Sequence, residues 1–175
     1  MCIRDSCSSY HLHHVAGKVV ALAEFEEYGE AYAKDIVKNS RALAESLAAE
    51  GFDVLAESRN YTASHQVLTR HGDIDSGAGA KAAKTLEDVG IITNMNMLPG
   101  DTKAMTPSGL RLGVQELTRE GMGKTEMAEV AKLFARALIH NEDLNRVKQD
   151  VTNLKSNFQT IRYCFNEEEQ SGYIL

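Results

Sequence analysis

The sequence lacks the features that mark several large classes of protein. It has no long run of lysine and arginine, and its formal net charge is -6, which argues against nucleic acid as a partner. No apolar stretch approaches the roughly 18 to 20 residues that span a membrane. The N-terminus also lacks the apolar core of a secretory signal. We therefore expect a cytoplasmic protein that associates with neither nucleic acid nor membrane.

Cysteine and metal-ligand patterns are also scarce. The three cysteines are odd in number and lack metal-ligand spacing, which predicts free thiols in a reducing compartment. Histidine gathers in the stretch HLHH at 11–14, but this spacing fits no standard zinc pattern. The sequence therefore predicts no metal site.

What is present is an ordinary globular composition with two unusual ends. The 175 residues, 43% of them hydrophobic and 25% charged, suffice for one domain with a real core. The stretch MCIRDS at the start leads into no pattern and looks like translated adapter sequence, so we treat 1–7 as a non-native or truncated end. We expect the native protein to extend further toward its N-terminus, and we expect 166–175 to be a frayed acidic tail.

Helical spacing dominates residues 8–50. Apolar side chains recur at intervals of three and four from Val15 to Leu47 in an alanine-rich context, which favours helix throughout. Gly29 is placed to divide this segment into two helices. Gly51 is placed to end it as a C-cap.

The remainder, 51–165, alternates between short strands and helices. Strands are predicted at 52–57, 64–70 and 91–94 and around Arg111, and helices at 77–90, 124–140 and 141–161. Both prolines lie in one loop, 97–107. The last helix carries a heptad seam from Leu144 to Ile161, which we expect to pack on the domain or on a partner subunit. This order predicts an α+β domain: a small, mostly antiparallel sheet with helices on one face.

One strand carries the most informative side chain. In TPSGLRLGVQELT (106–118), apolar residues alternate with Arg111, which has a glycine two positions to either side. We interpret Gly109 and Gly113 as clearing the face on which a ligand lies, since glycine in a strand often marks a close approach. A guanidinium offers a rigid fork that matches a carboxylate. The alternative, a surface arginine on an exposed strand, stays open from these residues alone.

Three further polar residues have competing interpretations. Asn94 and Asn96 follow an apolar strand, where they serve either turn chemistry or amide recognition of a polar ring. Lys18, one turn into an apolar helix, could be proposed as a Schiff-base nucleophile. Aliphatic lysine stems are common on helices, so we favour a solvent-directed ammonium.

Four segments, taken together and in order, resemble the serine (glycine) hydroxymethyltransferase family. Its C-terminal signature, a Ser-Gly-aliphatic-Arg-aliphatic-Gly run before Thr-Arg-x-Gly, is similar to TPSGLRLGVQELTREGM. The segments GIITNMNMLPGD, SHQVL and HLHHVAGKVVALAEF resemble its Asn-x-Asn segment, its Ser-His strand and the helix leaving its large domain. The likeness spans roughly residues 8 to 165 and is closest to the archaeal branch.

The resemblance implies an activity and an architecture. Members use pyridoxal phosphate to move a one-carbon unit between serine and a reduced pterin, tetrahydrofolate or tetrahydromethanopterin, leaving glycine. They are homodimers. Residues 51–165 would be the small C-terminal domain of a fold-type I pyridoxal phosphate-dependent transferase, and 8–50 the connecting helices from a large domain that this chain lacks.

The resemblance also implies roles for single residues. Arg111 would bind the carboxylate of serine or glycine, and Asn96 would contact the pterin. Ser8 and Ser9 occupy the place where a loop approaches the cofactor phosphate of the neighbouring subunit, although the family's glycines are missing there. The Schiff-base lysine lies upstream in the family, and Lys18 does not replace it, so we expect no catalytic residue in this chain and no activity from it alone.

Two alternatives remain. The first is another pyridoxal phosphate enzyme of the same architecture, a threonine aldolase or an aminotransferase. The Asn-x-Asn and Thr-Arg-x-Gly segments argue against it. The second is a non-catalytic module that binds an amino acid, or a partner through the heptad face.

Overall fold

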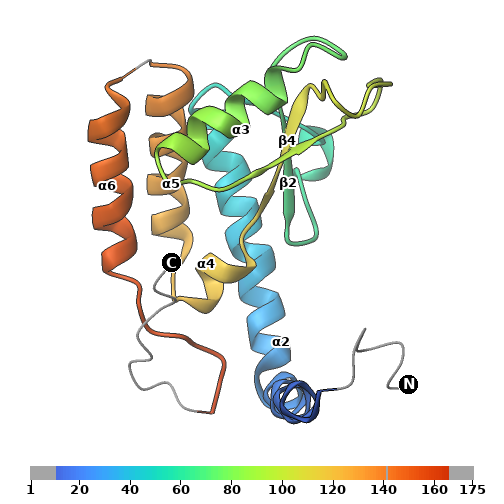
Figure 1. Cartoon of the computed structure of the whole chain (residues 1–175), viewed down its shortest axis with the longest axis vertical. Helices are drawn as coiled ribbons and strands as arrows, with labels where there is room; N and C mark the ends of the chain where they lie inside the picture. The colour runs from blue at the N-terminus through green and yellow to red at the C-terminus, as the bar shows by residue number, and fades with distance from the viewer. Residues whose placement is uncertain (1–10, 141, 166–175) are drawn as a thin grey trace.

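The computed structural model describes residues 11–140 and 142–165, which form helices packed on a small sheet (Figure 1). The elements in chain order are α2 (Leu12–Ala49), β1 (Asp53–Val54), η1 (Glu57–Arg59), β2 (Gln66–Arg70), α3 (Ala78–Asp88), β3 (Asn94–Asn96), β4 (Gly109–Gly113), α4 (Gln115–Arg119), α5 (Lys124–Leu138) and α6 (Leu144–Ser156). Among the described residues, no helix combines the length and the apolar character that crossing a bilayer requires.

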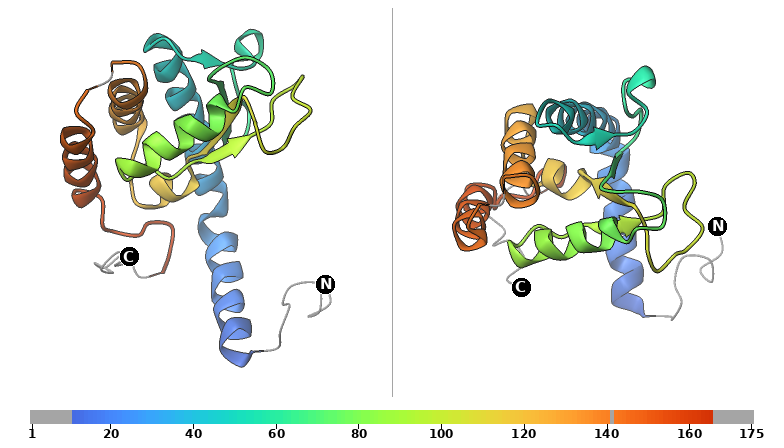
Figure 2. Two further views of the ribbon diagram at one scale, coloured as in Figure 1. Left: turned by 45° about the horizontal axis from the view of Figure 1, so that its top comes forward. Right: turned by 90° about the horizontal axis from the view of Figure 1, so that it is seen from above.

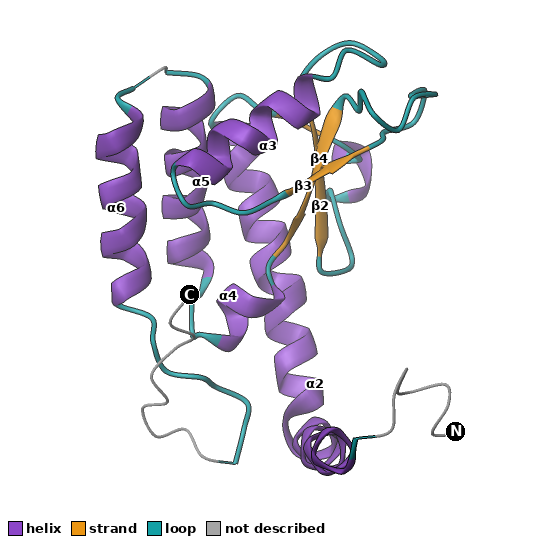
Figure 3. Cartoon of the chain, viewed as in Figure 1, coloured by secondary structure: helices purple, strands orange, loops and turns teal. Residues whose placement is uncertain are grey.

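The sheet has four strands in the order β1-β2-β4-β3, and every neighbouring pair is antiparallel (Figure 3). Strand β4 lies between β2 and β3, with Arg111 at its centre opposite Leu68 on one side and Asn94 on the other. The predicted α+β class with a small antiparallel sheet is confirmed.

The two faces of this sheet differ in what covers them. The core face carries Val54, Val67, Thr69, Leu110 and Leu112, all of them buried. Alternation along each strand sends the intervening side chains to the opposite side, which we call the open face. The open face carries Asp53, Gln66, Leu68, Arg70, Asn94, Asn96, Gly109, Arg111 and Gly113.

Helices α2, α3 and α5 supply much of the rest of the core. The apolar stripe of α5 buries Met127, Ala131 and Phe134, and the C-terminal half of α2 buries Leu43 and Leu47 in the same cluster. In Figure 3 these helices lie to one side of the strands. Helix packing on one face follows from the apolar stripe that each amphipathic helix must bury.

The heptad seam of the last helix packs on its own domain. This was one of the two alternatives predicted from the sequence. Val147 is fully buried, and Leu144, Val151 and Leu154 pack against the core cluster. Arg136 of α5 strengthens the contact, because its guanidinium donates to Asp150 of α6 at 2.6 Å. Helix α6 ends at Ser156, so the seam's last residue, Ile161, lies beyond the helix.

Helix α2 corrects one prediction. It runs unbroken for 38 residues, so the expected division at Gly29 was wrong. A glycine does not end a helix whose neighbours have strong helical propensity, although Figure 1 shows α2 changing direction along its length. Its N-terminal half projects from the domain (Figure 2) and exposes large apolar side chains, among them Val19, Leu22 and Phe25. Gly51, with φ of 94°, follows the helix end as predicted.

Two strands also differ from their predicted bounds. Strand β3 occupies 94–96 rather than 91–94, because the Ile91 amide donates to Leu86 O and so belongs to the end of α3. Strand β1 has two residues rather than six, because Ala56 adopts a left-handed conformation, φ 65°, and ends the pairing. Helix α4 was not predicted. The proposed boundary at residue 51 stays a prediction, and the predicted ends 1–7 and 166–175 lie outside the described residues.

Candidate functional site

Arg111 is the unpaired cation at the middle of the open face. Its side chain is exposed, and no hydrogen bond or ion pair within residues 11–140 and 142–165 involves it. Arg70, on the same face, differs because its Nε lies 3.5 Å from Asp53 Oδ2. Arg111 is therefore the arginine of this face that keeps its bidentate donors for a ligand.

The nearest strand neighbours of Arg111 are amides and an apolar side chain. Asn94 stands directly opposite it on β3 and is exposed, and Leu68 stands opposite it on β2. Asn96, one pair further along the same face, donates from Nδ2 to Met97 O at 2.6 Å. Amides supply both donors and acceptors without charge, so the guanidinium is the group here that attracts an anion.

The interpretation of the flanking glycines was half wrong. A Cβ on Gly109 would lie 2.4 Å from Leu98 Cγ and 2.7 Å from Thr69 O. Gly109 is buried under Leu98, so close packing and not an open gap explains this glycine. Gly113 is exposed. A Cβ there would meet only the mobile end of the Gln115 side chain, with Oε1 at 2.7 Å. The face is therefore bounded by a flexible side chain on the Gly113 side of Arg111 and closed by Leu98 on the other.

Two carboxylates, those of Asp101 and Asp75, accept hydrogen bonds from the loop that connects β3 to β4. Asp101 Oδ2 accepts hydrogen bonds from the Leu98 and Ser108 amides, both at 2.9 Å, and from Ser108 Oγ at 2.8 Å. Its Oδ1 accepts from the Asp75 amide at 2.9 Å. The backbone amides of Asp75, Leu98 and Ser108 together hold the pKa of Asp101 well below its usual range.

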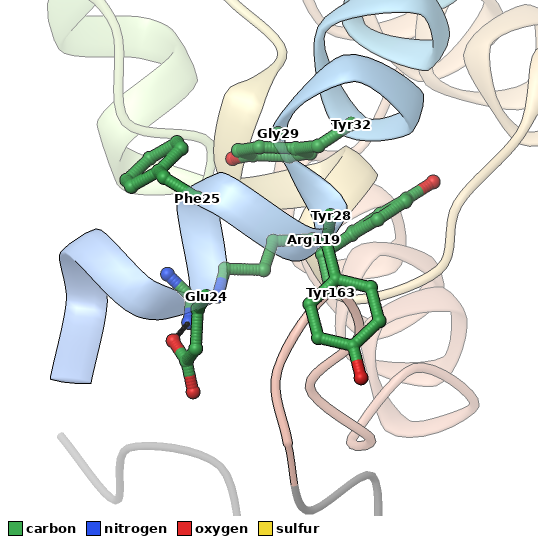
Figure 4. Close-up of a pocket in the computed structure, with 7 residues that line it drawn as sticks. All are labelled: Glu24, Phe25, Tyr28, Gly29, Tyr32, Arg119 and Tyr163. Atoms are coloured by element: carbon green, nitrogen blue, oxygen red, sulfur yellow. Dashed lines mark hydrogen bonds and ion pairs between the residues drawn. The ribbon is translucent and has the colours of Figure 1, made fainter.

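A shallow pocket lies elsewhere, between α2, α4 and the segment that follows α6 (Figure 4). Its lining residues are Glu24, Phe25, Tyr28, Gly29, Tyr32, Arg119 and Tyr163. Tyr163 packs on Tyr32 with ring centroids 4.9 Å apart, and its hydroxyl donates to Asp35 at 2.8 Å. Burial and this hydrogen bond raise the pKa of Tyr163 to about 12. Neither Arg111 nor Asn96 lines the pocket.

Sequence reasoning missed this pocket. Tyr28 and Tyr32 are four residues apart on one helix, a spacing that places them together on one side. Nothing in the sequence indicates that Tyr163, 131 positions later, joins them. The loop carboxylates were missed as well, because most of their partners are backbone amides, which carry no sequence signal.

The other predicted residues do not gather at the open face. Lys18 is exposed on the projecting half of α2. The rings of His11, His13 and His14 lie within 6 Å of one another, yet the described residues contain no group of metal ligands that could hold an ion. Ser8 and Ser9 lie outside the described residues.

The donor set on the open face suits a carboxylate better than an aldehyde cofactor. Strands β1 to β4 contain no lysine, so the sheet offers no amine for a Schiff base. The exposed guanidinium of Arg111 fits the acid group of an amino acid. An aldehyde cofactor would need its amine from elsewhere in the protein.

Comparison with known proteins gives this geometry a context. The family model described as serine hydroxymethyltransferase matches residues 6–134. The chain is 52% identical over 161 residues to the serine hydroxymethyltransferase of Pyrococcus horikoshii, covering 91% of this chain and 38% of that protein. It is 46% identical over 170 residues to the enzyme of the same name from Thermoplasma acidophilum, covering 95% of this chain and 39% of that one.

A solved structure shares the fold as well. The L-threonine transaldolase of Pseudomonas fluorescens superimposes with a TM-score of 0.75 at 31% identity, over 83% of this chain and 33% of that one. The chain thus spans somewhat over a third of the length of these two relatives and about a third of the transaldolase. The family model covers well over half of the chain, and the matched stretch includes the whole sheet and Arg111. The chain therefore belongs to the serine hydroxymethyltransferase family.

Proposed function

We propose that this chain is the C-terminal portion of a pyridoxal phosphate-dependent enzyme that interconverts serine and glycine and transfers the one-carbon unit to a tetrahydropterin. The observation that carries the proposal is the 52% identity over 161 residues to a protein named serine hydroxymethyltransferase. The unpaired Arg111 on the open face supports it, because an amino-acid substrate presents a carboxylate. The pterin is tetrahydrofolate or tetrahydromethanopterin.

Arg111 holds and orients the amino acid in this proposal. The two parallel N–H groups of a guanidinium bind both oxygens of one carboxylate and so fix the rotation of the substrate about its Cα. Pyridoxal phosphate, when bound, would supply the electron sink for bond breaking at Cα, so the rotation about Cα that Arg111 fixes would decide which bond breaks. Arg111 therefore contributes orientation, which a single point charge would provide less well.

Further parts of the proposal concern the co-substrate and the assembly. Asn96 contacts the pterin, for which its position on the open face, one pair along from Arg111, gives support. Ser8 and Ser9 approach the cofactor phosphate of a neighbouring subunit in a homodimer. We also propose a cytoplasmic location.

The main test transplants this chain into a full-length relative. A chimaera in which residues 8–165 replace the matching segment of the Pyrococcus horikoshii protein should convert serine to glycine in a pterin-dependent reaction. Arg111→Gln should lower kcat/KM for serine by about 100-fold or more, and Arg111→Lys should lose less because it keeps the charge. Arg59→Gln, at an exposed arginine of η1, is the matched control and should change little. Equal activity in Arg111→Gln and Arg59→Gln would contradict the role given to Arg111.

A second test addresses the missing Schiff base. The 175-residue chain, incubated with pyridoxal phosphate and reduced with borohydride, should carry no more cofactor when folded than when denatured. The chimaera should be labelled at one dominant lysine outside residues 8–165. Preferential labelling of a single lysine within the folded chain would overturn the assignment of that role to another part of the protein.

A second candidate function is a transfer reaction on threonine, favoured by the likeness to the L-threonine transaldolase. The two candidates differ in their need for the pterin. Serine turnover in the chimaera that requires the added tetrahydropterin supports the first candidate. Threonine turnover that proceeds equally well without pterin supports the second.

A further inference from the structure

We propose that Asp101 is a positioning residue that fixes Asn96 and Arg111 relative to one another. This proposal rests on the proposed function, since it assigns Asn96 to the pterin and Arg111 to the amino acid. On that basis Asp101 sets the separation of the two subsites, although it lies in the loop between them and touches neither ligand.

The geometry begins with what Asp101 ties together. Its carboxylate accepts from the amide of Leu98, two residues after Asn96, and from the amide and hydroxyl of Ser108, three residues before Arg111. Ser108 is fully buried, and Leu98 is 3% exposed. The carboxylate therefore joins the exit from β3 to the entry into β4 across the eleven-residue loop 97–107.

A second carboxylate extends the same connection. Asp101 Oδ1 accepts from the Asp75 amide, while the Asp75 carboxylate accepts from Thr102 N and Oγ1 and from Lys103 N at 2.6 to 2.8 Å. The loop 97–107 and the turn before α3 are thus held by hydrogen bonds in both directions. Hydrogen bonds from Thr102 and Lys103 also lower the pKa of Asp75, so both carboxylates are ionised at neutral pH.

Packing transmits this arrangement to the open face. The side chain of Leu98 lies over Gly109, where a Cβ would come within 2.4 Å of Leu98 Cγ. The backbone of Gly109 also packs against Gly79 of α3. A Cβ on Gly79 would lie 2.3 Å from Gly109 O. A shift of Leu98 therefore moves either Gly109, two residues from Arg111, or Met97, which follows Asn96.

The chemistry of four donors requires a carboxylate at this position. Three donors converge on Asp101 Oδ2 and one on Oδ1, and an ionised carboxylate accepts all four. Asparagine has one oxygen and an NH₂ group, so one side of the amide would face N–H donors with its own N–H. Asp101→Asn therefore loses either the hydrogen bond from Asp75 or those from Leu98 and Ser108, and the donors that remain bind a neutral oxygen. The connection is weakened with almost no change in volume.

The kinetic test uses the chimaera and separates the two substrates. Asp101→Asn should reduce pterin-dependent turnover of serine by about 10- to 100-fold, because a misplacement of about 1 Å can cost that much. Serine binding alone, followed by the cofactor's absorbance, should weaken only a few-fold, because Arg111 itself is retained. Asp73→Asn, an exposed carboxylate of the same turn, is the control and should leave both quantities unchanged.

Two other results would overturn the proposal. If Asp101→Asn weakens serine binding and pterin-dependent turnover equally, Asp101 supports the fold and does not set the separation of the subsites. If neither quantity changes, the carboxylate has no positioning role. Ser108→Ala removes one of the four donors and keeps the carboxylate, so it should show the same split with a smaller amplitude even if Asp101→Asn folds poorly.

A structural test on the 175-residue chain is independent of catalysis. In Asp101→Asn the amides of Asp75, Leu98 and Ser108 should exchange with deuterium at least about tenfold faster, and the NMR signals of Asn96 Nδ2 and Arg111 Nε should shift. Faster exchange with unchanged Asn96 and Arg111 signals would overturn the proposal. An inactive chimaera would count against the proposed function, while these signals would still decide whether Asp101 positions the two residues.

Discussion

The two faces of the small sheet differ in what covers them and in how far their side chains are exposed. The core face packs against three helices. On β2 and β4 every side chain that points to this face is buried, whereas Met95 of the edge strand β3 is exposed. The open face carries the exposed, unpaired guanidinium of Arg111, the exposed Asn94 and Gly113, and the half-buried Asn96. Strand β4 supplies both: Leu110 and Leu112 are at most 4% exposed, and Arg111 between them is exposed.

With the proposed function, this comparison predicts that stability and binding are separated within the five residues of β4. A period of two sends alternate side chains to opposite faces, so each face can vary without the other. Substitutions on the core face should therefore change the free energy of unfolding. Substitutions on the open face should change binding and leave that free energy nearly constant.

The largest effect is expected at Leu110, which is fully buried opposite Thr69. Leu110→Ala should lower the free energy of unfolding by about 2 to 5 kcal/mol, because it loses buried apolar area and leaves a cavity. Leu68→Ala on the open face, where the leucine is half-buried, should cost about 1 kcal/mol or less. Urea denaturation of both variants measures the difference, and equal losses would show that the two faces are not energetically distinct.

Gly79→Ala tests the contact between α3 and β4. Helix propensity alone predicts that alanine would stabilise by about 1 kcal/mol. A Cβ at Gly79, however, would lie 2.3 Å from Gly109 O, a backbone atom that cannot move cheaply. We therefore expect a net destabilisation of about 1 to 3 kcal/mol. Gly17→Ala on α2, where nothing lies within 4 Å, should stabilise, and a stabilising Gly79→Ala would refute the packing argument.

The core face could be predicted from the sequence, because it depends on short-range periodicity. The alternation around Arg111 and the apolar stripes of α5 and α6 each predicted an element and the face that it buries. The α+β class then followed from the order of the elements. Local pattern sufficed here because burying one stripe or one face leaves few alternatives.

The open face could be predicted only in part. The sequence indicated Arg111, but it suggested that Gly109 clears a gap, whereas Leu98 covers it. That contact brings together residues eleven positions apart through a loop whose shape depends on backbone amides bound to Asp101 and Asp75. Such bonds leave no periodicity. The start of β3 was misplaced for a related reason, because Ile91 is β-branched and apolar yet completes the end of α3.

His71 predicts a pH dependence that belongs to the core side of the sheet. Its Nε2 lies 2.9 Å from Thr69 Oγ1, its ring packs on Phe52, and burial lowers the pKa of its imidazole. The unfolded chain therefore takes up a proton near pH 6.5 before the folded chain does. The stability conferred by His71 is complete above that pH and is lost as the pH falls.

Denaturation between pH 7 and pH 5 measures this effect. The free energy of unfolding should decline across this range, and His71→Gln should flatten the decline. The exposed His140→Gln is the matched control and should retain it. A decline of the same slope in His71→Gln would assign the pH dependence to another group.

The smallest effect on stability is expected at Arg111. Its side chain is exposed and makes no hydrogen bond or ion pair within the described part of the chain, so Arg111→Gln removes no native interaction there. The free energy of unfolding should stay within about 0.5 kcal/mol of the unsubstituted chain, as for other surface positions. The same substitution should nonetheless abolish most serine turnover in the chimaera. A loss of stability comparable to that of Leu110→Ala would mean that Arg111 supports the fold, and the functional separation of the two faces would then fail at its central residue.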